Sequence, residues 1–123
     1  MTTYITTPIY YVNAQPHLGH AYTTIVDDTY SRFRRLCGED VRFQTGTDEH
    51  GDKIVEAAER ENVPPGEYVD KISNMFRDTW PLLEVVPDNY IRTTDPEHIA
   101  TVRDILQKVY DNGDIYFDEY TGL

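Results

Sequence analysis

Hydrophobic positions along the chain follow two different periods, which predicts strands alternating with helices. The stretch TYITTPIYYV, residues 3–12, is rich in β-branched and aromatic residues and predicts a strand that leaves the sheet at Pro8. Residues 16–36 carry apolar side chains at the helical intervals of three, four and seven, and Pro16 suits the first position of a helix. The apolar positions of this helix are Leu18, Tyr22, Ile25, Val26, Thr29, Phe33 and Leu36.

The same alternation continues to the end of the chain. Cys37 and Gly38 end the first helix, residues 40–47 predict a second strand, and residues 51–62 predict a helix that Pro64 and Pro65 stop. A further helix is predicted over residues 68–83, bent or ended at Pro81. Then come a strand over 89–94, a helix from Pro96 to the pair Asn112-Gly113 with Asp95 as its cap, and a strand over 114–120.

This order predicts an α/β fold in which helices cover both faces of a parallel sheet. Ligands of such sheets bind beyond the carboxyl ends of the strands. Two polar clusters, residues 13–20 and 46–51, follow predicted strands and are expected at that edge. The position of the two clusters is the first indication of a functional site.

Composition narrows the class of protein. The chain has 123 residues, the size of one domain, and its single cysteine, Cys37, fits a reducing, cytoplasmic location. No apolar run is long enough to span a membrane, and the N-terminus lacks the pattern of a signal peptide. The net charge of −11 argues against a broad nucleic-acid-binding surface on this chain.

The first cluster contains His17 and His20, three residues apart around Gly19 at the start of a predicted helix. The free N–H groups and the positive dipole end of a helix favour an anion, and two imidazoles would add donors for phosphate oxygens. Gly19 would let a flat group such as a base approach the backbone. Histidine pairs at this spacing are also common on helices without any function, and the spacing alone does not decide between the two.

The second cluster, TGTDEHGDK, places Asp48, Glu49, His50 and Asp52 around Gly51 after a strand. A carboxylate here suits a ligand's ammonium group, but a solvated acidic turn that caps the next helix explains the same residues. A third reading is a metal-dependent hydrolase, because nitrogen and oxygen ligands would come from four side chains: His17, His20, Asp48 and His50.

The segments TTPIYYVNAQPHLGH and GTDEHGDKI together resemble the N-terminal part of the methionyl-tRNA synthetase family, which are class I aminoacyl-tRNA synthetases. The tetrad at residues 17–20 resembles the family's HIGH signature, which alone is weak because other nucleotidyltransferases share it. The combination with GTDEHG is specific, and DNYIRTT and YDNGDIYFDEYTGL extend the likeness over essentially the whole chain. The resemblance implies a Rossmann-like nucleotide-binding half-domain.

The resemblance also implies roles for individual residues. His17 and His20 would stabilise the triphosphate of ATP during formation of methionyl adenylate, Gly19 would pack against adenine, and Asn13 would be a further nucleotide contact. Asp48 would hold the amino group of methionine, and the segment that lines the amino-acid pocket would contribute Pro8, Ile9 and Tyr11. The implied partners are methionine, ATP with Mg²⁺ and tRNA(Met), with no resident metal site, and no role follows for His50.

The family's catalytic domain is several times longer than this chain, so the resemblance implies the N-terminal half of that domain. The lysine-rich KMSKS loop is expected to be absent, because Lys53, Lys71 and Lys108 are isolated on predicted helices. The connective insertion, which binds zinc in many members, and the anticodon-binding domain are also expected to be absent. Such a piece is expected to be inactive alone and to self-associate through uncovered apolar surface, which leaves a non-catalytic binding module as an alternative.

Overall fold

The computed structural model describes residues 2–119 of the chain. These residues form two compact units, one that extends to Thr93 and one that starts at Thr94. The first unit contains the sheet and both polar clusters. Among the described residues, no helix is long and apolar enough to cross a membrane.

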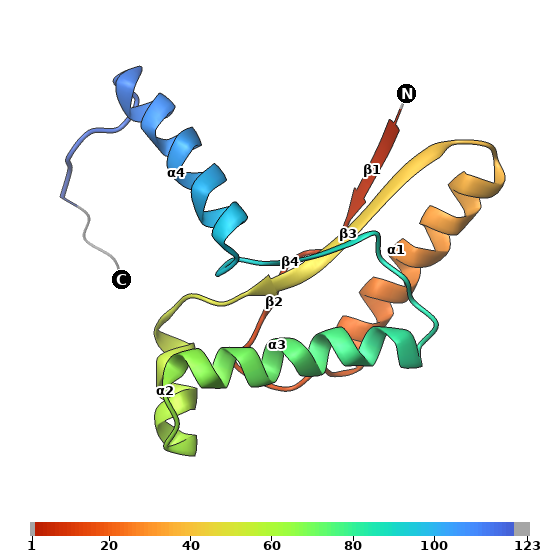
Figure 1. The fold of residues 1–123 in the computed structure, drawn as a ribbon, viewed down its shortest axis with the longest axis horizontal. Helices are drawn as coiled ribbons and strands as arrows, with labels where there is room; N and C mark the ends of the chain where they lie inside the picture. Colours follow the sequence, from red (N-terminus) through yellow and green to blue (C-terminus); the bar gives the residue numbers. More distant parts are fainter. Residues whose placement is uncertain (1, 120–123) are drawn as a thin grey trace. The chain divides into compact units, whose positions relative to one another are not determined.

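A parallel sheet forms the centre of the first unit (Figure 1). Its middle strand is β3 (Asp40–Asp48), whose first part pairs with β1 (Thr2–Thr6) and whose end pairs with β2 (Tyr10–Tyr11). The opposite edge of β3 pairs with β4 (Asn89–Arg92). The predicted first strand therefore does leave the sheet at Pro8, and it returns two residues later as β2.

The helices lie close to where the periodicity predicts them. They are α1 (Leu18–Leu36), α2 (Asp52–Glu61), α3 (Pro65–Leu82) and α4 (Pro96–Asp111). Helix α1 begins after Pro16 because His17 has an extended backbone and occupies the N-cap position. Helix α3 begins earlier than predicted, with Pro65 in its first turn, and contains Pro81 in its last turn.

The apolar core is formed by residues of the sheet, α2 and α3, and α1 packs beside it through polar contacts. Tyr10 of β2 is buried, stacks on Phe76 of α3 and bonds Thr24 of α1 through its hydroxyl, so both helices contact the same face of the sheet. The opposite face carries Tyr4, which is 61% exposed, and the exposed Arg42. The predicted Rossmann-like arrangement of a parallel sheet with helices is confirmed, and within this unit these helices cover one face.

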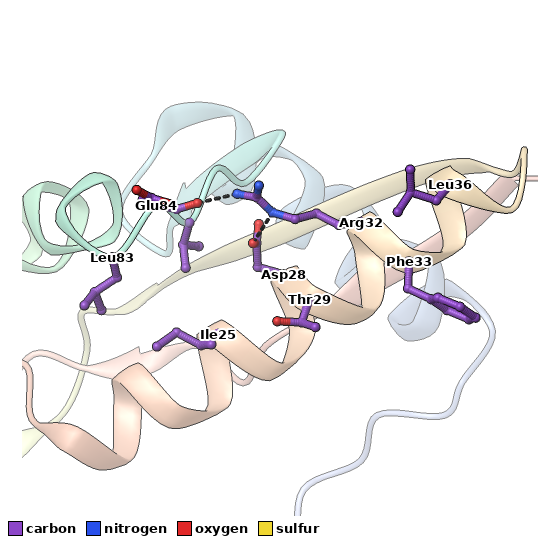
Figure 2. Close-up of a pocket in the computed structure, with 9 residues that line it drawn as sticks. Ile25, Asp28, Thr29, Arg32, Phe33, Leu36, Leu83 and Glu84 are labelled. Atoms are coloured by element: carbon purple, nitrogen blue, oxygen red, sulfur yellow. Dashed lines mark hydrogen bonds and ion pairs between the residues drawn. The ribbon is translucent and has the colours of Figure 1, made fainter.

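Helix α1 packs on the sheet with a polar side. Its buried residues are Thr24, Asp28 and Ser31, whereas Leu18 and Leu36 are 84% and 87% exposed. Figure 2 shows Arg32 between the Asp28 carboxylate and the carbonyl of Glu84, which joins α1 to the segment after α3. The apolar period thus located the helix correctly, but it marks the exposed side of the helix.

The second unit contains α4, with Asp95 at its N-cap position and Gly113 in the left-handed conformation after its end, as the sequence predicts. The strand predicted over residues 114–120 was wrong for residues 114–119, which are exposed and form no strand. A strand needs a neighbour for its backbone hydrogen bonds, and none pairs with this segment in the part of the chain that is described. Tyr120 lies outside the described residues.

Candidate functional site at the carboxyl ends of β2 and β3

The rings of His17 and His20 close the first turn of α1 by accepting hydrogen bonds from backbone N–H groups. The Nδ1 atom of His17 accepts a hydrogen bond from the Gly19 N–H at 3.1 Å, and Nδ1 of His20 accepts from the N–H of His17 at 3.2 Å. This is a reciprocal capping box, in which two of the free N–H groups at the helix start find partners. The remaining free N–H groups and the dipole still make this helix end suitable for an anion.

The two capping bonds determine which ring nitrogen carries the proton. Because both Nδ1 atoms act as acceptors, the neutral rings of His17 and His20 carry their N–H at Nε2. The rings stack with their centroids 3.7 Å apart, so the two Nε2–H donors belong to one assembly at the helix end. Such an arrangement can donate two hydrogen bonds to a phosphate group.

The surroundings of His20 favour the neutral ring. Its centroid lies 4.7 Å from that of Tyr10 and 5.0 Å from that of Phe76, which meets it edge-on. Burial, and then the neighbouring His17, lower the pKa of His20 below the usual histidine value. A neutral imidazole is therefore the expected form of His20 at neutral pH.

Gly19 has little space for a side chain. A Cβ atom at this position would lie 3.0 Å from Cε1 of His17, because the His17 ring folds back over the glycine to cap the helix. An open apolar hollow of about 540 Å³ begins at Gly19 and continues along α1 past Tyr22 to Val26. Gly19 thus allows the close approach of a ring to the backbone, here that of His17.

The two residues of β2 connect the histidine pair to the acidic cluster. Successive side chains of a strand point to opposite faces. Tyr10 lies on the buried side against His20, whereas Tyr11 is exposed and is the register partner of Asp48 on β3. Both clusters therefore lie next to β2 at the carboxyl edge of the sheet, with the histidine pair beside Tyr10 and Asp48 beside Tyr11.

The other expected pocket residues lie around this edge. Pro8 and Ile9 are exposed in the break between β1 and β2. Asn13 accepts a hydrogen bond at its carbonyl from the Tyr68 hydroxyl, and its side chain is exposed. Tyr11 and Asn13 also line an open hollow of about 520 Å³ together with the first turn of α2.

Glu49, the residue after Asp48, forms a buried ion pair that the sequence analysis did not predict. The Glu49 carboxylate is fully buried and accepts two hydrogen bonds from Arg92 of β4, at 2.7 and 2.8 Å. Its backbone N–H donates to Thr93, which also bonds Nδ1 of His50. The hydrogen bond to Glu49, more than any other cause, raises the pKa of Arg92 above its usual value. The alternation of side chains along the strand could have predicted its burial, because Glu49 lies two residues after the buried Thr47 and so on the same face.

The metal-site reading of the four side chains was wrong. Within residues 2–119, no three histidine, cysteine or acidic side chains gather as a metal site. One physical reason is that Nδ1 of His17 and His20 accepts a capping bond, which puts the proton on Nε2 and leaves no lone pair there for a metal. Nδ1 of His50 bonds Thr93. Asp48 is set apart from the histidine pair by the two faces of β2.

Comparison with known proteins identifies the family. A family model described as tRNA synthetases class I (M) matches residues 3–123. The chain belongs to this family. It is 58% identical over 119 residues to the methionine–tRNA ligase of Campylobacter jejuni and 52% identical over 121 residues to that of Bacillus subtilis. These alignments cover 97% and 98% of the chain but 19% and 18% of the two relatives.

The class I synthetase fold is also evident in solved structures. The Mycobacterium tuberculosis methionyl-tRNA synthetase in complex with methionyl-adenylate superposes with a TM-score of 0.95 at 43% identity. The match covers 98% of this chain and 24% of that one. The chain thus spans about a fifth to a quarter of the length of these class I synthetases.

Proposed function

We propose that the chain is the N-terminal half of the catalytic domain of a methionine–tRNA ligase. In that reaction the carboxylate of methionine attacks the α-phosphate of ATP, pyrophosphate leaves, and the methionyl group of the adenylate passes to the 3′ end of tRNA(Met). The sequence likeness to methionine–tRNA ligases supports the reaction class. A cytoplasmic location remains a prediction from the single cysteine.

His17 and His20 would bind the triphosphate, which enters with Mg²⁺, and would stabilise the charge that develops on phosphate oxygens. The support is the pair of Nε2–H donors at a helix N-terminus, which are preorganised by their capping bonds. Gly19 would lie against the adenine, and Asn13 would contact the nucleotide from the end of β2. None of these steps requires His50, which bonds Thr93.

Asp48 would hold the ammonium group of methionine by a charge-assisted hydrogen bond. Tyr11, its register partner, would close over the side chain, and Pro8 and Ile9 would complete the apolar wall. The single observation that carries the proposal is the β2 dipeptide, in which Tyr10 touches His20 while Tyr11 pairs with Asp48. The acid and the phosphate donors would thereby lie at one edge of the sheet, as a reaction between an amino acid and ATP requires.

The chain alone is proposed to bind ligands without turnover. Its lysines lie on α2, α3 and α4, and two of them form ion pairs, Lys71 with Glu61 and Lys108 with Asp104. A mobile lysine-rich loop and a zinc-binding insertion would come from other parts of a complete synthetase. The uncovered apolar side of α1 would favour self-association of the chain.

The test is a crossed titration of the chain with ATP and with methionine, without metal and with Mg²⁺, followed by NMR. His20→Ala should abolish the ATP-induced shifts at His17 while methionine still shifts the region around Asp48. Asp48→Ala should give the reverse, and His98→Ala on α4 is the matched histidine control.

In a complete synthetase, His20→Ala should slow ATP–pyrophosphate exchange by about 10²–10³-fold. Unchanged exchange, or zinc uptake without a response to ATP, would overturn the assignment.

A further inference from the structure

The most deeply buried charge near the proposed methionine site belongs to Glu49, the residue after Asp48. Its side chain is 0% exposed, and that of Arg92 is 16% exposed. An ion pair removed from water in this way is costly unless its geometry is good and its other hydrogen bonds are satisfied. Here Arg92 binds both carboxylate oxygens, and the Thr47 hydroxyl donates a further bond at 2.8 Å.

The contacts of this pair come from three separate elements. Glu49 follows the end of β3, Arg92 ends β4, and a further guanidinium bond of Arg92 goes to Asp70 on α3 at 2.6 Å. The residue after Arg92 acts on the same turn, because the Thr93 hydroxyl accepts the N–H of Glu49 at 2.8 Å. Arg92, the last residue of β4, and Thr93, which follows it, thus hold one residue of the turn by its side chain and by its backbone.

We propose that Arg92 is a positioning residue for Asp48, an inference that rests on the proposed function. Glu49 and Asp48 are adjacent, so anchoring the Glu49 side chain on one side of the strand end directs the Asp48 side chain to the other side, beside Tyr11. A hydrogen bond to an ammonium group needs its acceptor within a few tenths of an ångström of the right place. The pair acts through Asp48 and has no contact with the ligand itself.

The decisive variant is Arg92→Lys, which keeps the positive charge but loses the bidentate contact with Glu49. We expect it to weaken methionine binding by about tenfold, as for a misaligned hydrogen bond to a charged group. The ATP response at His17 and His20 should be unchanged, because the His20 ring packs against Tyr10 and Phe76 and the His17 ring stacks on it. A general loss of structure would instead weaken the binding of both methionine and ATP.

Two variants serve as controls. Asp70→Asn removes the negative charge of the outer partner of Arg92, a side chain that is 62% exposed, and leaves the two bonds to Glu49. It should bind methionine as wild type does. Val41→Ala creates a cavity at the far end of β3 and should lower the melting temperature with no change in methionine affinity.

A second readout keeps the inference separate from the proposed function. Amide hydrogen exchange at residues 48–50 reports whether the turn is held, whether or not methionine binds. Exchange there should rise in Arg92→Lys and in Glu49→Gln but remain unchanged in Asp70→Asn and Val41→Ala. If wild type bound no methionine but this pattern held, the proposed function would fail and the anchoring would stand. If Arg92→Lys changed neither exchange nor methionine affinity, the positioning role would be refuted.

Discussion

His17 and His20 stabilise the start of α1 in addition to their role in the proposed chemistry. The same ring that would meet a phosphate caps a helix through its other nitrogen. Protonation of Nδ1 would remove the acceptor and break the cap, so the proton count of His20 couples ligand binding to the stability of the helix end. Because the pKa of His20 is lowered, this protonation does not occur at neutral pH.

The pH dependence of stability follows from this residue. Since the folded protein binds the proton at His20 less readily than the unfolded chain, the unfolded chain holds more protons between the lowered pKa and the usual value of 6.5. The free energy of unfolding should therefore fall as the pH drops through that window. An NMR titration should place the midpoint of His20 below 6.5. His17→Gln should raise that midpoint by removing the neighbouring charge, and an unshifted midpoint in both forms would contradict the account.

At the scale of elements, the periodicity predicts where helices and strands occur better than it predicts which side of them is buried. The exposed apolar side of α1 and the missing strand at residues 114–119 have one cause, because each depends on a partner element that a local pattern does not contain. The histidine pair and Asp48 were found from local motifs. The bond from Glu49 to Arg92 joins residues 43 positions apart and depends on the register of β3 and β4.

That register depends on Gly46. A Cβ atom there would lie 2.0 Å from the carbonyl oxygen of Ile91 on β4. Gly46→Ala should therefore force β3 and β4 apart and destabilise the fold by about 1–3 kcal/mol or more, as overpacking does. Gly66→Ala is the matched control, since it meets nothing within 4 Å in the first turn of α3 and should change stability by no more than about 1 kcal/mol. Urea unfolding of both variants makes the comparison, and equal midpoints would contradict the close approach.

At the scale of the whole molecule, the acidic charge and the apolar side of α1 oppose each other. A net charge of −11 keeps copies of the chain apart, whereas the uncovered apolar residues draw them together. The open hollow of about 380 Å³ in Figure 2 lies on this helix, with Ile25 and Leu83 among its walls. Salt, which screens the charge, should therefore strengthen self-association.

Sedimentation velocity over a range of protein concentrations tests this balance. Val26→Glu with Phe33→Glu should shift the chain towards monomer, because both side chains are exposed on the apolar side of α1. The control is Arg60→Gln with Lys108→Gln, which makes the net charge equally more negative at exposed positions on other helices. Association that fell equally in both pairs would mean that charge, and not the apolar side of α1, sets the assembly state.

The length of the segment before β2 is itself constrained by the chemistry at its end. Tyr10 and Tyr11 do different work only because one faces α1 and the other accompanies Asp48. Removing or adding a single residue after Pro8 would exchange their faces, whereas a change of two would restore them. Insertions or deletions of an odd number of residues here should therefore be tolerated less well than those of an even number, whatever their size.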